Sequence, residues 1–256
     1  NQRLHGLIEQ LERNIALAIA NLEPSGLLTQ QEIENPTAEL VARLRRRSEE
    51  FARLREEALR ESGGRRHKDL DLIGASVVFL TDGAHERAFR RNPAVLRIED
   101  DVVVQALAKR DVGAQVQTLP WGVSRINAPL VWPMGNTANP IKVAVIDTGI
   151  SNSHPDLKAN VKGGYNAINT KRSWNDDNGH GSHVAGIIAA SNNSLGVVGA
   201  APAADLYAVK VLNSQGSGFL SDVIEGIQWA AQHGMQVANM SLGTGTNSPS
   251  LHDAVI

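Results

Sequence analysis

The stretch of sequence that decides the fold is Ile141-Lys-Val-Ala-Val-Ile-Asp-Thr-Gly-Ile150. Apart from one lysine, residues 141–146 are apolar and mostly β-branched, which predicts a strand buried on both of its faces. Strands of this kind belong to parallel sheets, because antiparallel sheets commonly leave one face to solvent. Asp147 follows at the carboxyl end of the predicted strand, which is where parallel sheets place their binding sites.

The sequence around this strand alternates between helix and strand patterns. Residues 206–211 and 235–240 predict two more buried strands, and residues 183–190 and 221–233 predict helices. A further helix is expected to begin near residue 251. This alternation predicts a parallel sheet with right-handed crossover connections, so we expect the second part of the chain to be an α/β domain.

The first part of the chain has a different composition. Residues 1–107 carry 16 Lys or Arg and 18 Asp or Glu, whereas residues 108–256 carry 9 of each. Helix and strand patterns predict a small α+β unit near residues 14–107, preceded by one more helix. The expected helices are residues 4–11, 40–58 and 84–91. The expected strands are residues 15–20 (with a continued helix as the alternative), residues 70–80 as one or two strands, and residues 95–104.

Composition excludes several classes of function. The 256 residues are 42% hydrophobic, which suits one large domain or two modest ones, and the net charge of −2 gives no reason to expect nucleic acid or an anionic membrane as a partner. There is no cysteine, so disulfides and thiol chemistry are excluded. No apolar run reaches the length of a membrane span. Because the sequence starts at Asn1, we expect that any signal peptide was removed or left out.

Asp147 has a chemical partner in His180, 33 residues further along the chain. The histidine lies in Asn178-Gly-His-Gly-Ser-His-Val-Ala-Gly186, where it opens a predicted helix. A carboxylate at a strand end can hold an imidazole in one tautomer, and the imidazole can then take a proton from a serine hydroxyl. Either residue alone could be ordinary, the aspartate capping a turn and the histidine lying on the surface. Together with their flanking glycines they predict two members of an Asp-His-Ser triad.

Two other chemistries fit parts of the same sequence. Asp147-Thr148-Gly149 also resembles the Asp-Thr-Gly of aspartic proteases, in which two carboxylates share a proton. That alternative gives His180 no role and predicts a β-rich fold, which the alternating pattern disfavours. His180 and His183 are three residues apart, but zinc needs a third protein ligand and no His-Glu-x-x-His pattern is present. We therefore expect His183 to be a packed helix residue.

From residue 117 to residue 256 the sequence resembles the subtilisin-like serine proteases (subtilases) nearly without gaps. Three segments carry the resemblance. They are similar to the mature amino terminus, the aspartate motif and the histidine motif of the family: Leu119-Pro-Trp-Gly-Val-Ser-Arg-Ile-Asn-Ala-Pro129, Asp147-Thr-Gly-Ile-Ser-Asn-Ser-His-Pro-Asp-Leu157 and Gly179-His-Gly-Ser-His-Val-Ala-Gly186. The resemblance implies a serine endopeptidase with a parallel-sheet, subtilisin-like α/β fold, in which Asp147 and His180 are catalytic.

The resemblance also implies where a peptide substrate binds. Gly216-Ser-Gly218 is similar to the edge strand that pairs with the substrate backbone, and Asn239-Met-Ser-Leu-Gly243 to the opposite wall of the cleft. A peptide between two such walls is held by its backbone, while side-chain pockets set the preference. The implied pockets are an apolar one lined by Leu220, Val223 and Leu242, and the primary one bordered by Ser241, Leu242 and Gly243; Gly216, Ser217 and Gly218 complete the implied substrate-binding set.

The catalytic serine is the part of the pattern that this sequence does not contain. The family's oxyanion-hole asparagine and its Gly-Thr-Ser-Met-Ala serine motif would fall after Ile256. Ser182 belongs to the histidine motif and Ser241 to the cleft wall, and neither lies in a Gly-x-Ser-x-Gly elbow. We therefore expect the chain alone to be inactive, as part of a longer protease. The alternative is a catalytically inactive pseudoprotease or an inhibitor-like fragment.

The first part of the chain resembles the family's propeptide, a small ferredoxin-like α+β domain that assists folding and then inhibits the enzyme. Arg91-Asn-Pro-Ala-Val95 and Ile98-Glu-Asp-Asp-Val-Val-Val-Gln-Ala-Leu107 are similar to its last helix and strand. The resemblance therefore implies a propeptide domain over residues 1–107, with an amino-terminal helical extension. Residues 108–256 would be the amino-terminal part of the catalytic domain.

The same match places the processing site at Leu107. Leu107 would then occupy the primary pocket of the cleft, with Val104 in the apolar one. Cleavage there would leave eight or nine residues ahead of the usual mature start, so cuts after Arg110 or Ala114 stay open.

A calcium site is implied by the resemblance as well. Calcium takes six or more oxygen ligands, which mix carboxylates, amides and backbone carbonyls. The implied ligands are the side chains of Gln117, Asp156 and Asn193 and the carbonyl groups of Ser191, Leu195 and Val197. Only one of these ligands is a carboxylate, so the alternative is a polar loop held by hydrogen bonds alone.

The resemblance further implies a bacterial protein that is secreted or extracellular, with the periplasm as the other compartment that fits. Its expected partners are protein or peptide substrates, its own propeptide as an intramolecular inhibitor, and the rest of the catalytic domain. Calcium is the expected cofactor, and neither nucleic acid nor a membrane is an expected partner.

Overall fold

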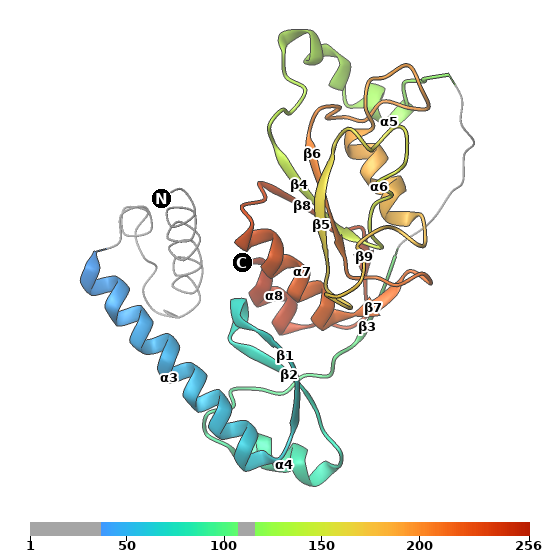
Figure 1. Ribbon diagram of the computed structural model, residues 1–256. Coiled ribbons are helices and arrows are strands. Elements are labelled where there is room, and N and C mark those ends of the chain that lie inside the picture. Colours follow the sequence, from blue (N-terminus) through green and yellow to red (C-terminus); the bar gives the residue numbers. More distant parts are fainter. Residues whose placement is uncertain (1–36, 107–115) are drawn as a thin grey trace. The chain divides into compact units, whose positions relative to one another are not determined.

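The computed structural model describes residues 37–106 and 116–256. Several expectations lie outside these residues, so the structure does not bear on them: the helix at residues 4–11, the strand at residues 15–20, and cleavage after Leu107, Arg110 or Ala114. The chain divides into two compact units (Figure 1), and each is described by itself. The first unit is Asn1–Asp101 with Ser248–Ile256, and the second unit is Val102–Asn247.

The second unit is built on the parallel sheet that the sequence predicts. Its strands are β4 (Lys142–Asp147), β5 (Val161–Asn166), β6 (Asp205–Lys210) and β8 (Val237–Asn239). Their order in the sheet is β5-β6-β4-β8, and each neighbouring pair is parallel, which confirms the α/β class. The strand β5 was not predicted, because its sequence Val-Lys-Gly-Gly-Tyr-Asn has two glycines and no apolar run.

Two helices of the second unit match predicted ones within a few residues: α6 (His180–Ala189) and α7 (Leu220–Gln232). The short helix α5 (Trp121–Arg125) and the 3-10 turns η2 (Ala128–Leu130) and η3 (Trp132–Met134) were not predicted. The helix α6 begins at His180, three residues earlier than expected. Gly179, in a left-handed conformation, is the residue that precedes its first turn.

The two long helices of this unit pack on opposite faces of the sheet (Figure 1). Side chains alternate along a strand, so neighbouring residues of β4 point to opposite faces. Val143 is buried in one cluster with Val184 of α6. On the other face, a Cβ at Gly226 of α7 would lie only 3.2 Å from Ile146 Cγ2 and 2.8 Å from Val211 Cγ1. Glycine at that position therefore lets α7 pack closely on the sheet.

A second sheet of this unit has three antiparallel strands in the order β7-β3-β9. They are β3 (Val103–Ala106), β7 (Ser217–Phe219) and β9 (Leu242–Gly243). The predicted strand at residues 95–104 is wrong in its extent. Strand pairing begins only at Val103, where β7 supplies hydrogen-bond partners, and Leu96 is 93% exposed.

The first unit combines helices with an antiparallel strand pair. Its described elements are α3 (Ala38–Ser62), β1 (Arg65–Leu70), η1 (Asp71–Ile73), β2 (Ala75–Phe79), α4 (Gly83–Arg91) and α8 (Pro249–Val255). The predicted helix at residues 84–91 is confirmed, and the carboxylate of Asp82 caps its first turn. Of the one or two strands predicted over residues 70–80, the structure has two, and β2 lies within that range. The strand β1 lies almost wholly ahead of it, and its start was missed because the charged sequence of residues 65–69 gives no apolar signal.

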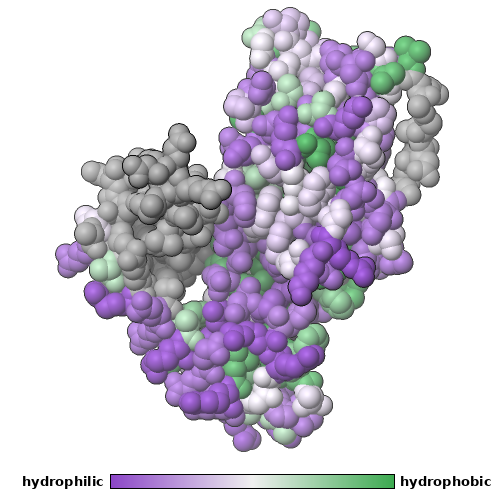
Figure 2. Space-filling model, viewed as in Figure 1, coloured by the Kyte–Doolittle hydropathy of each residue, from purple (hydrophilic) through white to green (hydrophobic). Residues whose placement is uncertain are grey.

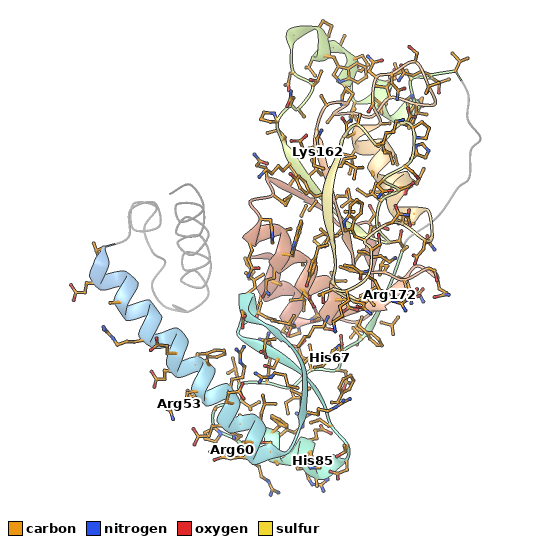
Figure 3. The ribbon with its side chains drawn as sticks, viewed as in Figure 1. Arg53, Arg60, His67, His85, Lys162 and Arg172 are labelled. Atoms are coloured by element: carbon orange, nitrogen blue, oxygen red, sulfur yellow. The ribbon has the colours of Figure 1, made fainter. Side chains whose placement is uncertain are left out.

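The helix α3 carries much of the first unit's charge. On the face that Figure 2 shows, most of the part of the first unit that is drawn in colour is hydrophilic. Figure 3 labels two arginines of α3, Arg53 and Arg60. They lie 3.3 and 4.0 Å from carboxylate oxygens of Glu57. Exposed pairs of this kind contribute only about 0.3–0.5 kcal/mol each.

Residues near the end of the chain belong to the first unit through polar contacts. Glu99 accepts hydrogen bonds from the hydroxyls of Ser248 and Ser250, each at 2.9 Å. Arg97 pairs with Asp253 of α8. These contacts explain why Ser248–Ile256 clusters with the first unit and not with the parallel sheet.

Candidate active site

Asp147 and His180 meet in a buried hydrogen bond. Nδ1 of His180 lies 2.8 Å from Oδ1 and 2.9 Å from Oδ2 of Asp147, and both side chains are almost fully buried. An ionised carboxylate only accepts hydrogen bonds, so Nδ1 carries the proton and donates it. The lone pair is then on Nε2, which is the atom that could take a proton from a hydroxyl group.

Burial and hydrogen bonding act on the pKa of Asp147 in opposite directions. Its carboxyl group has no exposed surface, and this burial raises the pKa above the usual range for aspartate. Hydrogen bonds from His180 and from the backbone N–H of Thr148, at 2.6 Å, lower the pKa without cancelling the effect of burial. The carboxylate is thus oriented by donors, while its charge remains unfavourable in this buried place.

The position of His180 depends on how α6 begins, because His180 is the first residue of that helix. Gly179 before it has a φ of 103°, a left-handed conformation that suits glycine. A Cβ at Gly181 would lie 2.1 Å from the carbonyl oxygen of Gly149 and 3.2 Å from Oδ1 of Asp147. Glycine at this position lets the first turn of α6 approach the end of β4, so that the imidazole reaches the carboxylate.

A second carboxylate, Asp176, was not predicted as part of the site. Its Oδ1 accepts from the Thr148 hydroxyl at 2.8 Å and from the N–H groups of residues 178 and 179 at 3.0 and 2.9 Å. Its Oδ2 accepts from the N–H and the hydroxyl of Ser182 at 2.9 and 2.6 Å. Burial alone would raise the pKa of Asp176, but these hydrogen bonds outweigh it and hold the pKa below the usual range. An aspartate four residues ahead of His180 was the available signal.

Lys210 was also missed, because a lysine at a strand end gives no sequence signal of burial. Its ammonium group donates at 2.7 Å to the carbonyl groups of Thr148 and Leu212 and to the carboxylate of Asp177. The residue is only 5% exposed, and a buried charge requires such partners. Since Lys210 lies opposite Asp147 in the β4–β6 register, it fastens the loop after Asp147 to two neighbouring segments.

The two predicted cleft walls lie on either side of β3. Val104 pairs with Gly218 of β7, and Ala106 pairs with Leu242 of β9. The N–H of Ala106 also donates to the carbonyl oxygen of Gly216 at 2.8 Å. A segment of the chain's own sequence is therefore the central strand between these walls, and its Val104 side chain is buried, with 1% exposure.

The remaining predicted substrate residues fall around the same sheet. Gln105 of β3 pairs with both Ser217 and Gly243, while Leu220 and Val223 lie buried in the first turn of α7. Neither alternative serine is poised to act as a nucleophile. The Ser182 hydroxyl donates to Asp176 and accepts from the Ser151 N–H, and the Ser241 hydroxyl accepts from Asn239 at 3.0 Å.

A cavity opens beside His180. Asn178 is held at its edge by a hydrogen bond from its Nδ2 to the carbonyl oxygen of Ser214 at 2.9 Å. Neither Asn178 nor Gln215 was predicted to line the site. The lining residues are Gln105, Ala106, Asn178, His180, Gln215, Gly216 and Ser217. The imidazole thus faces a space bounded by one predicted cleft wall and by β3.

The predicted calcium ligands gather around one loop of the second unit. Isolated bridges tie residues 116–118 to residues 195–197. The side-chain amide of Gln117 lies against two backbone carbonyls, with Nε2 at 3.0 Å from the oxygen of Ser191 and 3.3 Å from that of Val197. The Oε1 atom of the same amide accepts a hydrogen bond from the N–H of Ser194 at 3.3 Å.

Asp156 is the one carboxylate among the predicted calcium ligands. It lies in the segment that follows β4, and it is only 4% exposed. Its Oδ2 accepts from the N–H of Val197 at 3.0 Å, whereas its Oδ1 is buried without a hydrogen-bond partner. Asn193 uses its Oδ1 to accept from the N–H of Leu195 at 2.9 Å. A buried carboxylate oxygen without a donor is unfavourable, and a cation bound beside it would remove that penalty.

The prediction that His183 is a packed helix residue is only partly right. His183 lies in α6, but its side chain is exposed and not packed. Within residues 37–106 and 116–256 no group of three or more His, Cys, Asp or Glu is placed to hold a metal ion.

Comparison with known proteins agrees with the resemblance found in the sequence. Residues 138–255 match the model of the Subtilase family. The chain is 49% identical over 168 residues to an alkaline protease of Shouchella clausii, which covers 66% of this chain and 41% of the relative. It is 42% identical over 202 residues to subtilisin E of Bacillus subtilis (strain 168), and this match covers 78% of this chain and 50% of the relative. It is 53% identical over 139 residues to subtilisin Savinase of Lederbergia lenta, and this match covers 54% of this chain and 51% of the relative. The chain spans about half the length of the curated relatives it matches.

Proposed function

We propose that the whole protein is a subtilisin-like serine endopeptidase that hydrolyses proteins or peptides, because residues 138–255 match the model of the Subtilase family. The observation that carries the proposal is the buried hydrogen bond from Nδ1 of His180 to Asp147 at 2.8 Å. That bond fixes the imidazole tautomer and leaves Nε2 as the base, at the edge of a cavity beside the predicted cleft walls.

Each residue has a distinct part in the proposed reaction. The imidazole of His180 takes the proton of a serine hydroxyl as the serine oxygen attacks the scissile carbonyl carbon, and later gives that proton to the leaving amine. Asp147 orients the imidazole and stabilises its protonated form. The serine, and an asparagine that donates to the oxyanion, would come from sequence outside these 256 residues. The greater length of the relatives supports this division.

The two alternative functions fit this geometry to different degrees. An aspartic protease would need a second carboxylate that shares a proton with Asp147, whereas this carboxylate faces an imidazole at the end of a parallel strand. An inactive pseudoprotease or inhibitor-like fragment would keep the same hydrogen bond, so it differs from the enzyme only in lacking the serine. An intact mass of the natural protein distinguishes the fragment from the longer enzyme.

We propose that a substrate binds as an added strand between β7 and β9, with Gly216–Gly218 and Ser241–Gly243 as the two walls. The position of β3 between these walls supports the proposal, since its backbone already pairs with both. Residues 1–107 would then be an inhibitory propeptide whose last residues block the cleft until cleavage, with Leu107 as the processing site.

Calcium is proposed as a stabilising ligand of the loop around Asp156. The unpartnered Oδ1 of Asp156 and the carbonyl groups of Ser191 and Val197, drawn together by Gln117, are the observations that support it. Asn193 and the carbonyl group of Leu195 would complete the set, in keeping with the all-oxygen shell that calcium prefers. The bound ion would supply positive charge to a buried carboxylate and tie residues 116–118 to the loop.

A secreted or extracellular location is proposed by similarity to the bacterial relatives. None of the helices that the structure describes is both long and apolar enough to cross a membrane.

A covalent probe tests the proposed activity. A serine-directed fluorophosphonate added to the natural full-length protein should label one serine, outside residues 1–256, and pepstatin should leave peptide hydrolysis unchanged. Asp147→Asn should slow labelling, because the serine would lose its oriented base. Inhibition by pepstatin without fluorophosphonate labelling would instead favour the aspartic-protease alternative and refute the proposal.

The tail that forms β3 gives a separate test of the propeptide. Residues 1–107 added in trans should inhibit the mature enzyme, and Leu107→Ala should weaken inhibition about ten- to a hundredfold, since a buried leucine side chain contributes roughly 1.5–3 kcal/mol. Val104→Asp should be worse, because it brings a carboxylate into a place where Val104 is 1% exposed. Exposed Val103→Asp is the matched control. Equal inhibition by all four segments would show that this tail does not occupy the cleft.

A further inference from the structure

The proposed reaction leaves the buried carboxylate of Asp176 without a role. We infer that Asp176 is a positioning residue, which acts through Thr148 and Ser182 to hold the imidazole of His180 against Asp147. The consequence for turnover rests on the proposed function, whereas the consequence for the geometry of the imidazole does not.

Asp176 supports the first turn of α6, which carries His180. The first N–H groups of a helix have no partner within the helix, so they need acceptors from outside it. The N–H groups of residues 180–182 donate to Asn178 Oδ1, Thr148 Oγ1 and Asp176 Oδ2, at 3.1, 2.9 and 2.9 Å. Asn178 and Thr148 are in turn both bonded to Asp176. All three acceptors for this turn therefore depend on one carboxylate.

Thr148, which directly follows Asp147, connects Asp176 to the catalytic pair. Its hydroxyl donates to Asp176 and accepts from the N–H of Gly181, so the same oxygen contacts the carboxylate and the helix. Its backbone N–H donates to Oδ1 of Asp147 at 2.6 Å. Thr148 is thus the bridge through which Asp176 fixes the distance between the end of β4 and the first residue of α6.

The charge of Asp176 is required for this arrangement. Oδ2 receives two donors from Ser182, and Oδ1 receives three more, so both oxygens act only as acceptors. An amide at this position would turn an NH₂ group toward donors on one side. The amino-terminal end of α6 also favours a negative charge.

Asp176 acts through other residues and not on a substrate. The cavity beside His180 is lined by other side chains, and the five hydrogen bonds of Asp176 all come from within the protein. A helix cap that served stability alone would produce the same contacts. The test therefore needs a measurement that follows the imidazole itself.

The test uses the natural full-length protein and the variants Asp176→Asn, Thr148→Val and Thr148→Ser. Thr148→Val removes the bridging hydroxyl at constant volume and charge, and Thr148→Ser restores it. Asp205→Asn is the control for loss of charge, because this carboxylate lies 3.5 Å from Lys162 in a partly exposed pair (Figure 3). Two measurements are made below the melting temperature of each variant. The first is the downfield proton NMR signal of His180 Nδ1–H, and the second is the kinetics of hydrolysis of a peptide substrate, which gives kcat and KM.

We expect Asp176→Asn and Thr148→Val to shift or broaden the Nδ1–H signal and to lower kcat about ten- to a hundredfold with little change in KM, as for a misplacement of about 1 Å. Thr148→Ser and Asp205→Asn should match the wild type in both measurements. If Asp176→Asn does not fold, the Thr148→Val and Thr148→Ser pair decides the question without any change of charge.

The inference is overturned if Asp176→Asn keeps the wild-type Nδ1–H signal and kcat, even when its melting temperature changes. If Asp176→Asn does not fold, the same result for Thr148→Val overturns it. A failure of the proposed function gives a different result. The wild type would then hydrolyse no peptide, while the Nδ1–H signal would still report whether Asp176 positions His180.

Discussion

Two buried aspartates of the second unit contrast in how the protein satisfies them. Asp147 has no exposed surface, and its oxygens accept from His180 and from the backbone of Thr148. Asp156 is 4% exposed, and one of its oxygens accepts from Val197 while the other has no partner. Both carboxylates belong to motifs that resemble one family, but only the first has all its partners within the protein.

The difference indicates two kinds of site. Around Asp147 the protein supplies every donor, so the geometry is fixed before any ligand arrives, as catalysis by a preorganised group requires. Around Asp156 a buried oxygen lacks a donor, so the arrangement gains stability only when a cation binds. We therefore expect changes at Asp147 to act on turnover and changes at Asp156 to act on stability.

The largest expected effect is that of Asp147→Asn on turnover. An asparagine keeps the shape but can present its NH₂ group to the imidazole and favour the wrong tautomer, and in serine proteases the equivalent change costs about 10⁴ in kcat. Peptide hydrolysis by the natural full-length protein measures it, with Asp205→Asn as the control. A fall of less than about tenfold would show that turnover does not depend on Asp147 orienting the imidazole, and would remove the contrast with Asp156.

Calcium should produce the next largest effect. A ligand at 100 times its Kd that binds only the folded state adds about 2.7 kcal/mol, which is roughly 5–11 °C in melting temperature for a domain of this size. Calcium added after chelation should raise the melting temperature of the mature protein by that order, and Asp156→Ala should abolish the response. Magnesium is the control ion, because it prefers an octahedral shell that keeps several waters. An equal response of Asp156→Ala would exclude the proposed site.

Asp156→Asn and the wild type should exchange their order of stability when calcium is removed. Asp156→Asn keeps an oxygen for the N–H of Val197 but replaces the unpartnered Oδ1 with a neutral donor. Under chelation the variant should be more stable than the wild type by about 1 kcal/mol, and with calcium it should be less stable. Chemical unfolding under both conditions measures the difference. A variant that is less stable in both conditions would show that Oδ1 has a partner in the calcium-free protein.

The sequence predicts the parts of this structure that depend on local patterns. The strand that ends at Asp147 is a continuous apolar run, and α6 starts at a glycine-flanked histidine, so both were predicted close to their observed bounds. Residues 161–166 were missed because two glycines and polar side chains hide an edge strand. The strand at residues 95–104 was predicted too long, because its pairing depends on partners more than a hundred residues away.

Long-range contacts also explain which site residues were missed. Asp147 and His180 have recognisable neighbours in sequence, whereas Asp176 becomes part of the site only when Thr148 is brought beside it. Two of the three acceptors of Lys210, the carbonyl group of Thr148 and the carboxylate of Asp177, lie in segments that only the folded chain brings beside it. The unpartnered oxygen of Asp156 is likewise a property of the folded loop and not of its sequence.

The smallest expected effects concern how stability depends on pH, and they compare Asp147 with Asp176. Burial raises the pKa of Asp147, so its ionised form destabilises the fold at neutral pH, and this penalty disappears as the pH falls through the folded pKa and then the unfolded one. Hydrogen bonds lower the pKa of Asp176 despite its burial. Its carboxylate therefore stabilises the fold above the unfolded pKa, and that contribution is lost as the pH falls through the depressed folded pKa.

Unfolding free energies of the wild type, Asp147→Asn and Asp176→Asn should therefore change in opposite ways between about pH 5 and pH 2, where carboxyl groups titrate. Acidification should raise the stability of the wild type relative to Asp147→Asn, because the wild type loses a penalty that the variant lacks. It should bring Asp176→Asn closer to the wild type, because the wild type loses a favourable contribution. Asp205→Asn controls for the general loss of one negative charge. If both variants drift in the same direction, the two carboxyl groups do not differ in the sign of their pKa shifts, and their distinct roles would need another physical basis.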